Sequence, residues 1–268
     1  MKISNREFSG HTYIMGILNV TPDSFSDGGQ FNTIDKALKH AEQMIKEGVD
    51  VIDIGGESTR PGYIKVSEAE ESERVCPVIE KIKANFDIPV SIDTYKFSVA
   101  ENAVKAGADL INDIWGFRYD KGQMAALAGK YNKPVCLMHN RKKTDYKDFL
   151  FDVVSDLEES VTIAERAGLT RDMIMLDPGI GFAKTLEQNL ELTNKLEVLN
   201  KLGLPILLGT SRKSMIGLTL DLPVTERLEG TLVTTVMAVQ KNCLFVRVHD
   251  IKENKRAILM TEKILGKI

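Results

Sequence analysis

Short apolar segments recur along the whole chain, and polar or charged residues follow each of them at once. There are about eight of these segments, the number of strands in a (β/α)₈ barrel. In that fold the active-site residues follow the carboxyl ends of the strands, so the pattern predicts a barrel with its chemistry gathered at one rim. The segments are Tyr13–Leu18, Val51–Ile54, Val90–Ile92, Leu110–Ile111, Val135–Met138, Met173–Leu176, Ile206–Leu208 and Leu244–Val248.

The stretches between these segments have the period of amphipathic helices, with apolar residues three and four positions apart. Clear examples are Ile34–Gly48, Asp148–Ala167 and Asn254–Leu265. Ser67–Glu70 has the form of a capping box, and the helix that it opens is expected to bend or break at Pro77. An open, doubly wound α/β sheet would show the same periodicity. Eight strand–helix units in 268 residues favour the α/β TIM barrel as a single domain over residues 1–268.

Composition excludes several classes of function. The formal net charge of −3 argues against a nucleic-acid-binding protein, which needs a clustered basic face. Cys76, Cys136 and Cys243 are far apart and form no metal-binding spacing, so we expect reduced thiols. The first residues include no apolar signal segment, and no apolar run is long enough to span a membrane. A cytoplasmic enzyme is expected.

Two polar loops follow the first two apolar segments. Asn19 leads into the loop 21–32, and its amide oxygen is a suitable ligand for a hard cation such as Mg²⁺. A turn stabilised by side-chain hydrogen bonds explains the same residues. The second loop, 57–66, overlaps the motif Asp53–Gly62. In this motif two adjacent glycines allow a ligand to approach the backbone, and Arg60 suits an anion or a carboxylate.

Three further polar residues, Asp93, Asn112 and Asp177, each end a predicted strand. Carboxylates accept hydrogen bonds from parallel N–H donors, and an amide both donates and accepts. Together they match the edge of an aminopyrimidinone ring, such as guanine or a pterin. The same three residues could also ligate a metal, or could cap the helices that follow.

The last two predicted strands deliver cationic residues. Loops in this part of a barrel commonly bind phosphate, and Arg247 and His249 lie two apart, on one face of the strand. A solvated strand end with Asp250 as a helix cap is the alternative. Lys213, in the loop after the seventh strand, suits either an anion site or a Schiff base of the aldolase type.

Seven motifs, in order and over nearly the whole chain, match one known family. They are Asn19–Gly29, Asp53–Gly62, Ser91–Lys96, Ile111–Gly116, Asp177–Phe182, Ser211–Lys213 and Arg247–Asp250. They resemble dihydropteroate synthase. The resemblance implies a barrel enzyme that uses Mg²⁺ to join 6-hydroxymethyl-7,8-dihydropterin diphosphate to p-aminobenzoate in folate synthesis. It also implies a homodimer, and a p-aminobenzoate pocket for which sulfonamide analogues compete.

The resemblance also assigns roles to individual residues. The pterin contacts are Asp93, Asn112, Met138, Asp177 and Lys213. The diphosphate contacts are Asn19, which also binds the metal, Arg247 and His249. The p-aminobenzoate contacts are Phe25, Thr59, Arg60, Pro61, Phe182 and Ser214. The catalytic set is Asp27, Asp93, Asp177 and Lys213.

One segment departs from the family pattern. The family usually continues the Met-His pair with another Met and a glycine, whereas Met138-His139 is followed here by Asn140–Lys143. Three other functions compete with the synthase: a pterin-binding methyltransferase domain, a Schiff-base aldolase that uses Lys213, and a protein that sequesters pterins without turnover. Release of pyrophosphate from the two substrates would distinguish the synthase from the sequestering protein, and borohydride trapping with a carbonyl substrate would reveal the aldolase.

Overall fold

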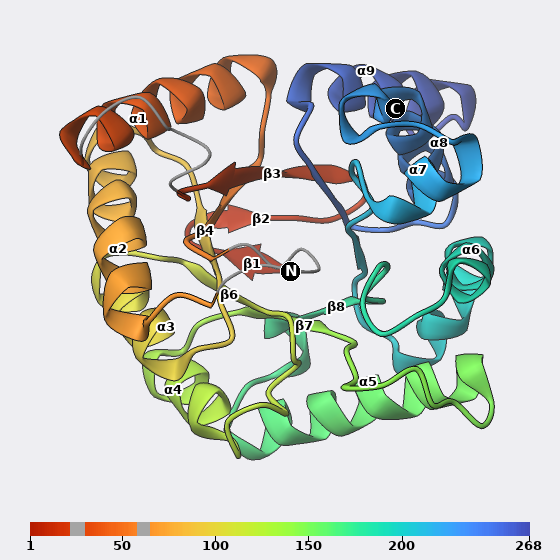
Figure 1. Cartoon of the computed structure of the whole chain (residues 1–268), viewed down its shortest axis with the longest axis horizontal. Helices are drawn as coiled ribbons and strands as arrows, with labels where there is room; N and C mark the ends of the chain where they lie inside the picture. The colour runs from red at the N-terminus through yellow and green to blue at the C-terminus, as the bar shows by residue number, and fades with distance from the viewer. Residues whose placement is uncertain (22–29, 58–64) are drawn as a thin grey trace.

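The computed structural model describes residues 1–21, 30–57 and 65–268, drawn as ribbon in Figure 1. Five of the residues with predicted roles lie outside these ranges. They are Phe25, Asp27, Thr59, Arg60 and Pro61.

A parallel sheet forms the centre of the molecule. Within the described ranges it has eight strands in the order β8-β7-β6-β5-β4-β3-β10-β9. A parallel bridge between Leu176 and Ile206 joins the two outer strands, so the sheet closes into a barrel. The strands are β3 (Tyr13–Asn19), β4 (Val51–Gly55), β5 (Val90–Asp93), β6 (Leu110–Asp113), β7 (Val135–Met138), β8 (Ile174–Asp177), β9 (Leu207–Leu208) and β10 (Phe245–Val248). The predicted barrel is confirmed, and the open sheet is wrong.

A helix follows each strand, and Figure 1 shows these helices as a ring around the strands. They are α1 (Gln30–Glu47), α2 (Glu68–Asn85), α3 (Phe97–Lys105), α4 (Gln123–Tyr131), α5 (Phe149–Arg166), α6 (Leu186–Asn194), α7 (Ser214–Leu220), α8 (Leu228–Gln240) and α9 (Ile251–Ile264). Short 3₁₀ turns occupy Arg171–Met173, Leu196–Leu202 and Val224–Glu226. The loop predicted over 21–32 is shorter than expected, because α1 already begins at Gln30.

The expected break at Pro77 is wrong, because α2 runs unbroken through it. The Ser67 side chain caps the helix by accepting a hydrogen bond from the Glu70 amide, while the Glu70 carboxylate pairs with Arg74 instead of closing a capping box. The helix buries an apolar stripe against the barrel, and this packing offsets the hydrogen bond that proline removes. The stripe consists of Val75, Val78, Ile79 and Ile82.

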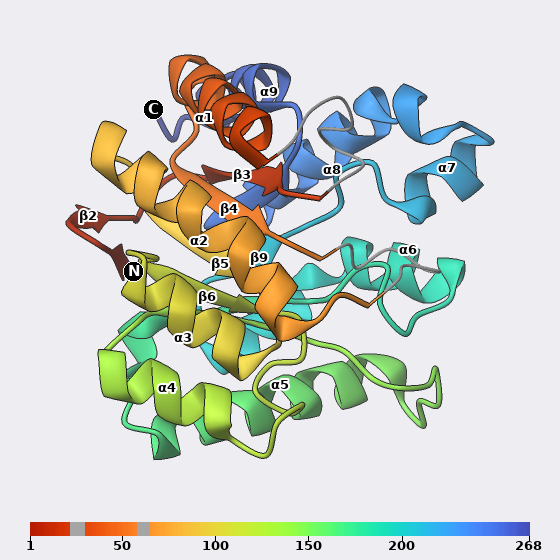
Figure 2. The ribbon, with the colours of Figure 1, turned by 60° about the vertical axis from the view of Figure 1, so that its left-hand side comes forward.

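The barrel interior is layered. Its lower layer is apolar and fully buried, and the N-terminal hairpin of β1 (Lys2–Ile3) and β2 (Arg6–Glu7) covers it at one end of the barrel (Figure 2). The layer contains Met15, Val51, Leu110, Cys136, Met175, Leu207 and Phe245. Side chains alternate along a strand, so the residue two positions further on also faces inward. Those next residues are Ile17, Asp53, Asn112, Met138, Asp177, Gly209 and Arg247. This second layer carries Asp53, Asn112, Asp177 and Arg247 and is called the polar layer below. It lies directly above the apolar layer.

A buried ion cluster ties the end of β4 to α2 and to the start of α3. The Lys96 ammonium donates to the Glu57 carboxylate at 2.7 Å, to Glu71 at 2.6 Å and to the Val66 carbonyl at 2.8 Å. The Tyr95 hydroxyl donates to Glu57 at 3.0 Å. These bonds hold the residues on both sides of the segment 58–64, which lies outside the described residues.

Replacement of Lys96 by methionine is expected to destabilise the fold strongly. The variant would leave two buried carboxylates without their cation, which costs about 3–5 kcal/mol of unfolding free energy. Lys105→Met is the matched control, because Lys105 pairs with Glu101 at the surface and should contribute less than about 1 kcal/mol. Urea unfolding of both variants measures the difference, and equal losses would contradict the role of the cluster.

Candidate functional site

An arginine bonded to two aspartates occupies the polar layer. The Arg247 guanidinium donates from Nε to Asp53 at 2.6 Å and from Nη2 to Asp93. Asn112 also donates to Asp53, at 3.1 Å. Strands β4, β5, β6 and β10 therefore meet at one point in the barrel. The predicted proximity of Asp93 to Arg247, on which the sequence argument depended, is observed.

A second group of charges converges above Gly209. A Cβ built at this glycine would lie 3.4 Å from Asp177 Oδ2, 3.8 Å from Lys213 Nζ and 3.8 Å from Arg247 Cβ. A side chain at position 209 would fill the space between them. The acidic, cationic and glycine residues of β8, β9 and β10 thus border one space, next to the Arg247 cluster.

Burial shifts the protonation of these groups. The pKa of Asp93 is raised to about 7 because the carboxyl is buried, an effect that Arg247 opposes and Asp53 reinforces. Burial likewise lowers the pKa of Lys213 to about 8, and the neighbouring Asp177 charge opposes that shift. The pKa of Asp177 is raised by burial too. The site is an assembly of charges held away from water.

Two oxygens of this cluster are left over. Asp53 Oδ1 and Asp93 Oδ1 are buried and have no hydrogen-bond partner among the described residues. Buried polar atoms are almost always paired, so unpaired acceptors inside a barrel mouth favour a ligand that brings N–H donors. Such donors are present on the edge of an aminopyrimidinone ring.

Asn19 and His249, the other predicted phosphate contacts, lie at the same rim. A Cβ at Gly55 would be 3.7 Å from Asn19 Oδ1 and 3.8 Å from Asp93 Oδ2, so both oxygens border one point above Gly55. His249 follows β10, and its Nδ1 lies 3.0 Å from the Ser211 hydroxyl. The Ser211 oxygen accepts from the His249 amide at 3.2 Å, so its proton is available to Nδ1. This orients the imidazole.

The fit to Mg²⁺ depends on the kind of donor rather than on a protein cage. Among the residues that the structure describes, no group of three or more His, Cys, Asp or Glu side chains could hold a metal ion. Mg²⁺ keeps several waters and commonly takes one or two protein oxygens together with substrate phosphates. The amide oxygen of Asn19 meets that requirement for a metal that arrives with a diphosphate.

The p-aminobenzoate residues are only partly described. Phe182 is half-buried and packs with Met138, Tyr95, Ile114 and Trp115 in a small apolar cluster. The Lys213 ammonium lies 5.0 Å from the centre of the Phe182 ring. Ser214 is exposed at the first residue of α7. Met138 and Phe182 therefore give the mouth an apolar wall beside its charged groups.

The sequence argument did not give Asp53 a role of its own. It lies inside an apolar strand, where its sole signal is a carboxylate two residues after the inward-facing Val51. Asp113, by contrast, is structural, because its carboxylate accepts from the Trp115 and Phe117 amides, each at 2.8 Å. An acidic residue at a strand end is therefore not enough to mark the site.

Comparison with known proteins decides the family. A family model described as pterin binding enzyme matches residues 15–249. The dihydropteroate synthase of Clostridium beijerinckii is 63% identical over 268 residues, 99% of each chain. The chain belongs to the dihydropteroate synthase family. Membership makes it an enzyme, a transferase of folate synthesis, and confirms the predicted resemblance.

Solved structures of dihydropteroate synthases agree. The enzyme of Clostridium difficile, solved in the presence of pteroic acid, is 52% identical with a TM-score of 0.94, over 97% of this chain and 98% of that one. The enzyme of Xanthomonas albilineans, solved with 4-aminobenzoic acid, is 39% identical with a TM-score of 0.90, over 96% of this chain and 94% of that one.

The described part of the chain contains no helix with the length and apolar character that a membrane span requires.

The raised pKa of Asp93 predicts a pH dependence of stability. Between the unfolded value of 3.8 and the folded value of about 7, the folded state binds the proton more tightly, so its stability increases as the pH falls. This contribution should amount to roughly 2–4 kcal/mol over that range. Denaturant unfolding at pH 7.5 and pH 5 measures it as the difference between the wild type and Asp93→Asn, which lacks the titration. Parallel pH profiles would contradict the assignment.

Proposed function

We propose that the barrel mouth joins 6-hydroxymethyl-7,8-dihydropterin diphosphate to p-aminobenzoate, with release of pyrophosphate and formation of 7,8-dihydropteroate. The observation that carries this proposal is the bonding of Asp53 and Asp93 to Arg247, which joins an acidic ring-binding cluster to a cationic group. Ligands of the two solved relatives, pteroic acid and 4-aminobenzoic acid, correspond to the product and to one substrate.

The pterin ring is bound by Asp93, Asn112, Asp177 and Lys213, with Met138 against its face. The unpaired Oδ1 of Asp93 supports this, because the N–H groups of the ring would satisfy a buried acceptor. Lys213 donates to the Ile180 carbonyl at 2.5 Å and lies close to Asp177. Ammonium and carboxylates thus present both donors and acceptors to a ring that carries both.

The diphosphate is held by Arg247, His249 and Asn19. A guanidinium and a histidine N–H donate to phosphate oxygens, and a bound Mg²⁺ on Asn19 would neutralise further negative charge. Arg247 is oriented by two carboxylates and His249 by Ser211, so both donors are positioned before the substrate arrives. The diphosphate therefore leaves as a stabilised anion.

The reaction proceeds by dissociation. The bond between the pterin methylene carbon and the diphosphate oxygen breaks, and its electron pair leaves with pyrophosphate. Asp27, Asp93 and Asp177 stabilise the positive charge that develops on the methylene and ring. The amine of p-aminobenzoate then forms the C–N bond and loses one proton to water or to the departing pyrophosphate. Exclusion of water from the site would prevent hydrolysis of the cation.

We expect p-aminobenzoate to contact Phe182 and Ser214, together with Phe25, Thr59, Arg60 and Pro61, which lie outside the described residues. Arg60 pairs with its carboxylate, and Phe182 contacts its ring. Sulfonamides, as analogues of p-aminobenzoate, compete for this pocket.

The enzyme acts as a cytoplasmic homodimer. The support for a dimer is a set of exposed apolar side chains on α7, α8 and α9, of which α8 and α9 pack against each other. These residues are Leu218, Leu220, Val233, Leu259, Met260 and Ile264. Sedimentation of the purified chain at micromolar concentration tests the dimer, and a monomer mass would contradict it.

Pyrophosphate release from the two substrates together tests the reaction. Lys213→Ala is expected to lower kcat/KM for the pterin diphosphate by about 100-fold, because it removes a half-buried hydrogen-bond donor to the ring. Arg60→Ala should mainly raise the KM for p-aminobenzoate. Lys195→Ala, at an exposed lysine paired with Glu191, is the control and should behave as wild type. Wild-type protein that releases no pyrophosphate would contradict the proposed function.

A further inference from the structure

A half-buried lysine fixes the turn that follows β8. The Lys184 ammonium donates to the Gly179 carbonyl at 2.9 Å, to the Phe182 carbonyl at 3.0 Å and to His139 Nδ1 at 2.8 Å. An ammonium has three N–H groups, so these three acceptors use all of its donors. Lys184 therefore holds both ends of the turn 179–182 and the end of β7 together.

His139 passes this contact on to helix α5. Its side chain has no exposed surface, and Nε2 lies 3.0 Å from Asp156 Oδ2. Because Lys184 can only donate to Nδ1, the ring is neutral and its proton is on Nε2, directed at Asp156. Burial lowers the pKa of His139 to about 4, although Asp156 opposes the shift. The three side chains form one directed chain of hydrogen bonds.

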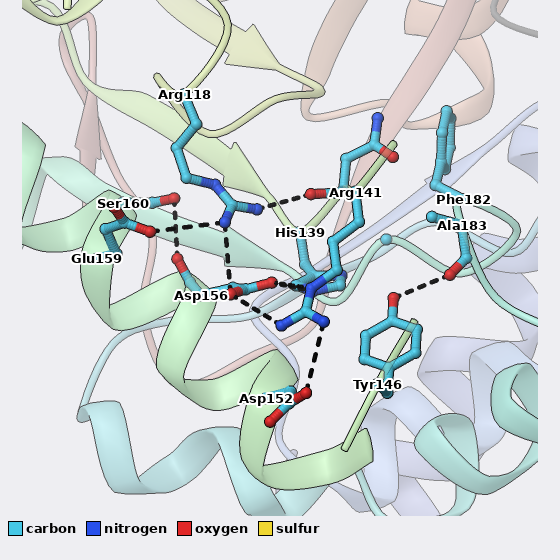
Figure 3. Close-up of polar contacts among 12 residues, drawn as sticks. Arg118, His139, Arg141, Tyr146, Asp152, Asp156, Glu159, Ser160, Phe182 and Ala183 are labelled. Atoms are coloured by element: carbon cyan, nitrogen blue, oxygen red, sulfur yellow. Dashed lines mark hydrogen bonds and ion pairs between the residues drawn. The ribbon is translucent and has the colours of Figure 1, made fainter. Parts of the chain in front are cut away.

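Two arginines, Arg118 and Arg141, contact Asp156 as well, as Figure 3 shows. We call these two arginines, together with Lys184, His139 and Asp156, the anchor. Arg141 donates to the two oxygens of Asp156 at 2.6 and 3.1 Å, and Arg118 lies 3.5 Å from the same carboxylate. Tyr146, whose ring lies under Arg141, donates to the Ala183 carbonyl at 2.9 Å. The segment after His139, which departs from the usual family pattern, therefore supports the turn after β8 from a second side.

The turn itself carries groups of the mouth. Its Gly179 amide donates to Asp177 at 2.7 Å, its Ile180 carbonyl accepts from Lys213, and Phe182 lies beneath the Lys213 ammonium. There is no room for the turn to shift inward: a Cβ at Gly179 would lie 1.9 Å from the His139 carbonyl oxygen. The conformation held by Lys184 thus sets where Phe182 and Lys213 stand.

We propose that Lys184 is a positioning residue, which holds the turn 179–182 so that Phe182 can receive the ring of p-aminobenzoate, with His139 and Asp156 fixing Lys184 from behind. Lys184 itself makes no contact with substrate in this account, since its donors are all used within the protein. The inference rests on the proposed function for the identity of the ring.

Lys184→Met tests the proposal, with Lys184→Arg as the conservative variant and Lys195→Met as the control at an exposed lysine. Misplacement of a substrate contact by about 1 Å costs on the order of 10- to 100-fold, so we expect a rise of that size in the KM for p-aminobenzoate. The KM for pterin diphosphate should rise by a smaller factor, because Asp93 and Asn112 are fixed by their strands, although Asp177 and Lys213 bond to the turn. Lys184→Arg should restore most of the loss. Equal changes in both KM values, or none, would overturn the proposal.

The pH profile gives a readout that needs no destabilising variant. Burial lowers the pKa of Lys184 to about 7, which the Asp177 charge opposes. A neutral amine has two N–H groups for three acceptors, so the KM for p-aminobenzoate should rise with pH around 7. The titratable and charged groups that face Lys184 are His139, Asp177, Lys213, Asp156 and Arg141. These remain in Lys184→Arg, where the rise should be absent. The same rise in both proteins would assign it to another group.

Hydrogen exchange of the amides in 179–183 separates this inference from the proposed function, because it does not need turnover. Exchange should be faster in Lys184→Met than in wild type and unchanged in Lys195→Met. Slow exchange in a folded Lys184→Met would overturn the positioning role. If exchange is faster in Lys184→Met than in wild type but the wild type releases no pyrophosphate, the positioning role of Lys184 stands and the proposed reaction is refuted.

Discussion

The site depends on one interaction, the guanidinium of Arg247 bonded to Asp53 and Asp93 inside the barrel. A buried charge is tolerated only when it is paired, so each member of this group makes the others possible. The arginine also has a second function. In the proposed function it joins the carboxylates that would bind the pterin ring to the cationic groups that would bind the diphosphate, and so would place the two halves of one substrate side by side.

This arrangement is possible because the barrel interior is layered. Apolar side chains and the N-terminal hairpin fill the lower part, and the next inward-facing residues of the same strands carry the charges. Removal of water below the site strengthens every electrostatic interaction above it. Asp53 Oδ1 and Asp93 Oδ1 remain without partners among the described residues, and this leaves hydrogen-bonding capacity for a ligand. A ligand that donates to these two oxygens would therefore gain hydrogen bonds that the free protein lacks.

Much of this was predictable from the sequence, because the barrel repeats one local pattern. Apolar segments that end in polar residues located the strands, and strand order then placed Asp93 and Arg247 in one mouth. Contacts that depend on side chains distant in sequence were not predictable. Asp53 is one acidic residue inside an apolar strand, and nothing local pairs Lys184 with His139, which is 45 residues earlier. The break expected at Pro77 was wrong because packing of α2 on the barrel outweighs the local preference of proline.

The central claim is that Arg247 and its paired carboxylates act as one unit, and a double-mutant cycle of Asp53 and Arg247 tests it directly. The measured quantity is kcat/KM for the pterin diphosphate in Asp53→Asn, in Arg247→Met and in the double variant. If the two residues act as one unit, the loss caused by Asp53→Asn should be smaller once Arg247 is gone, by a coupling of about 1–3 kcal/mol. Effects that multiply independently in the double variant would contradict the account.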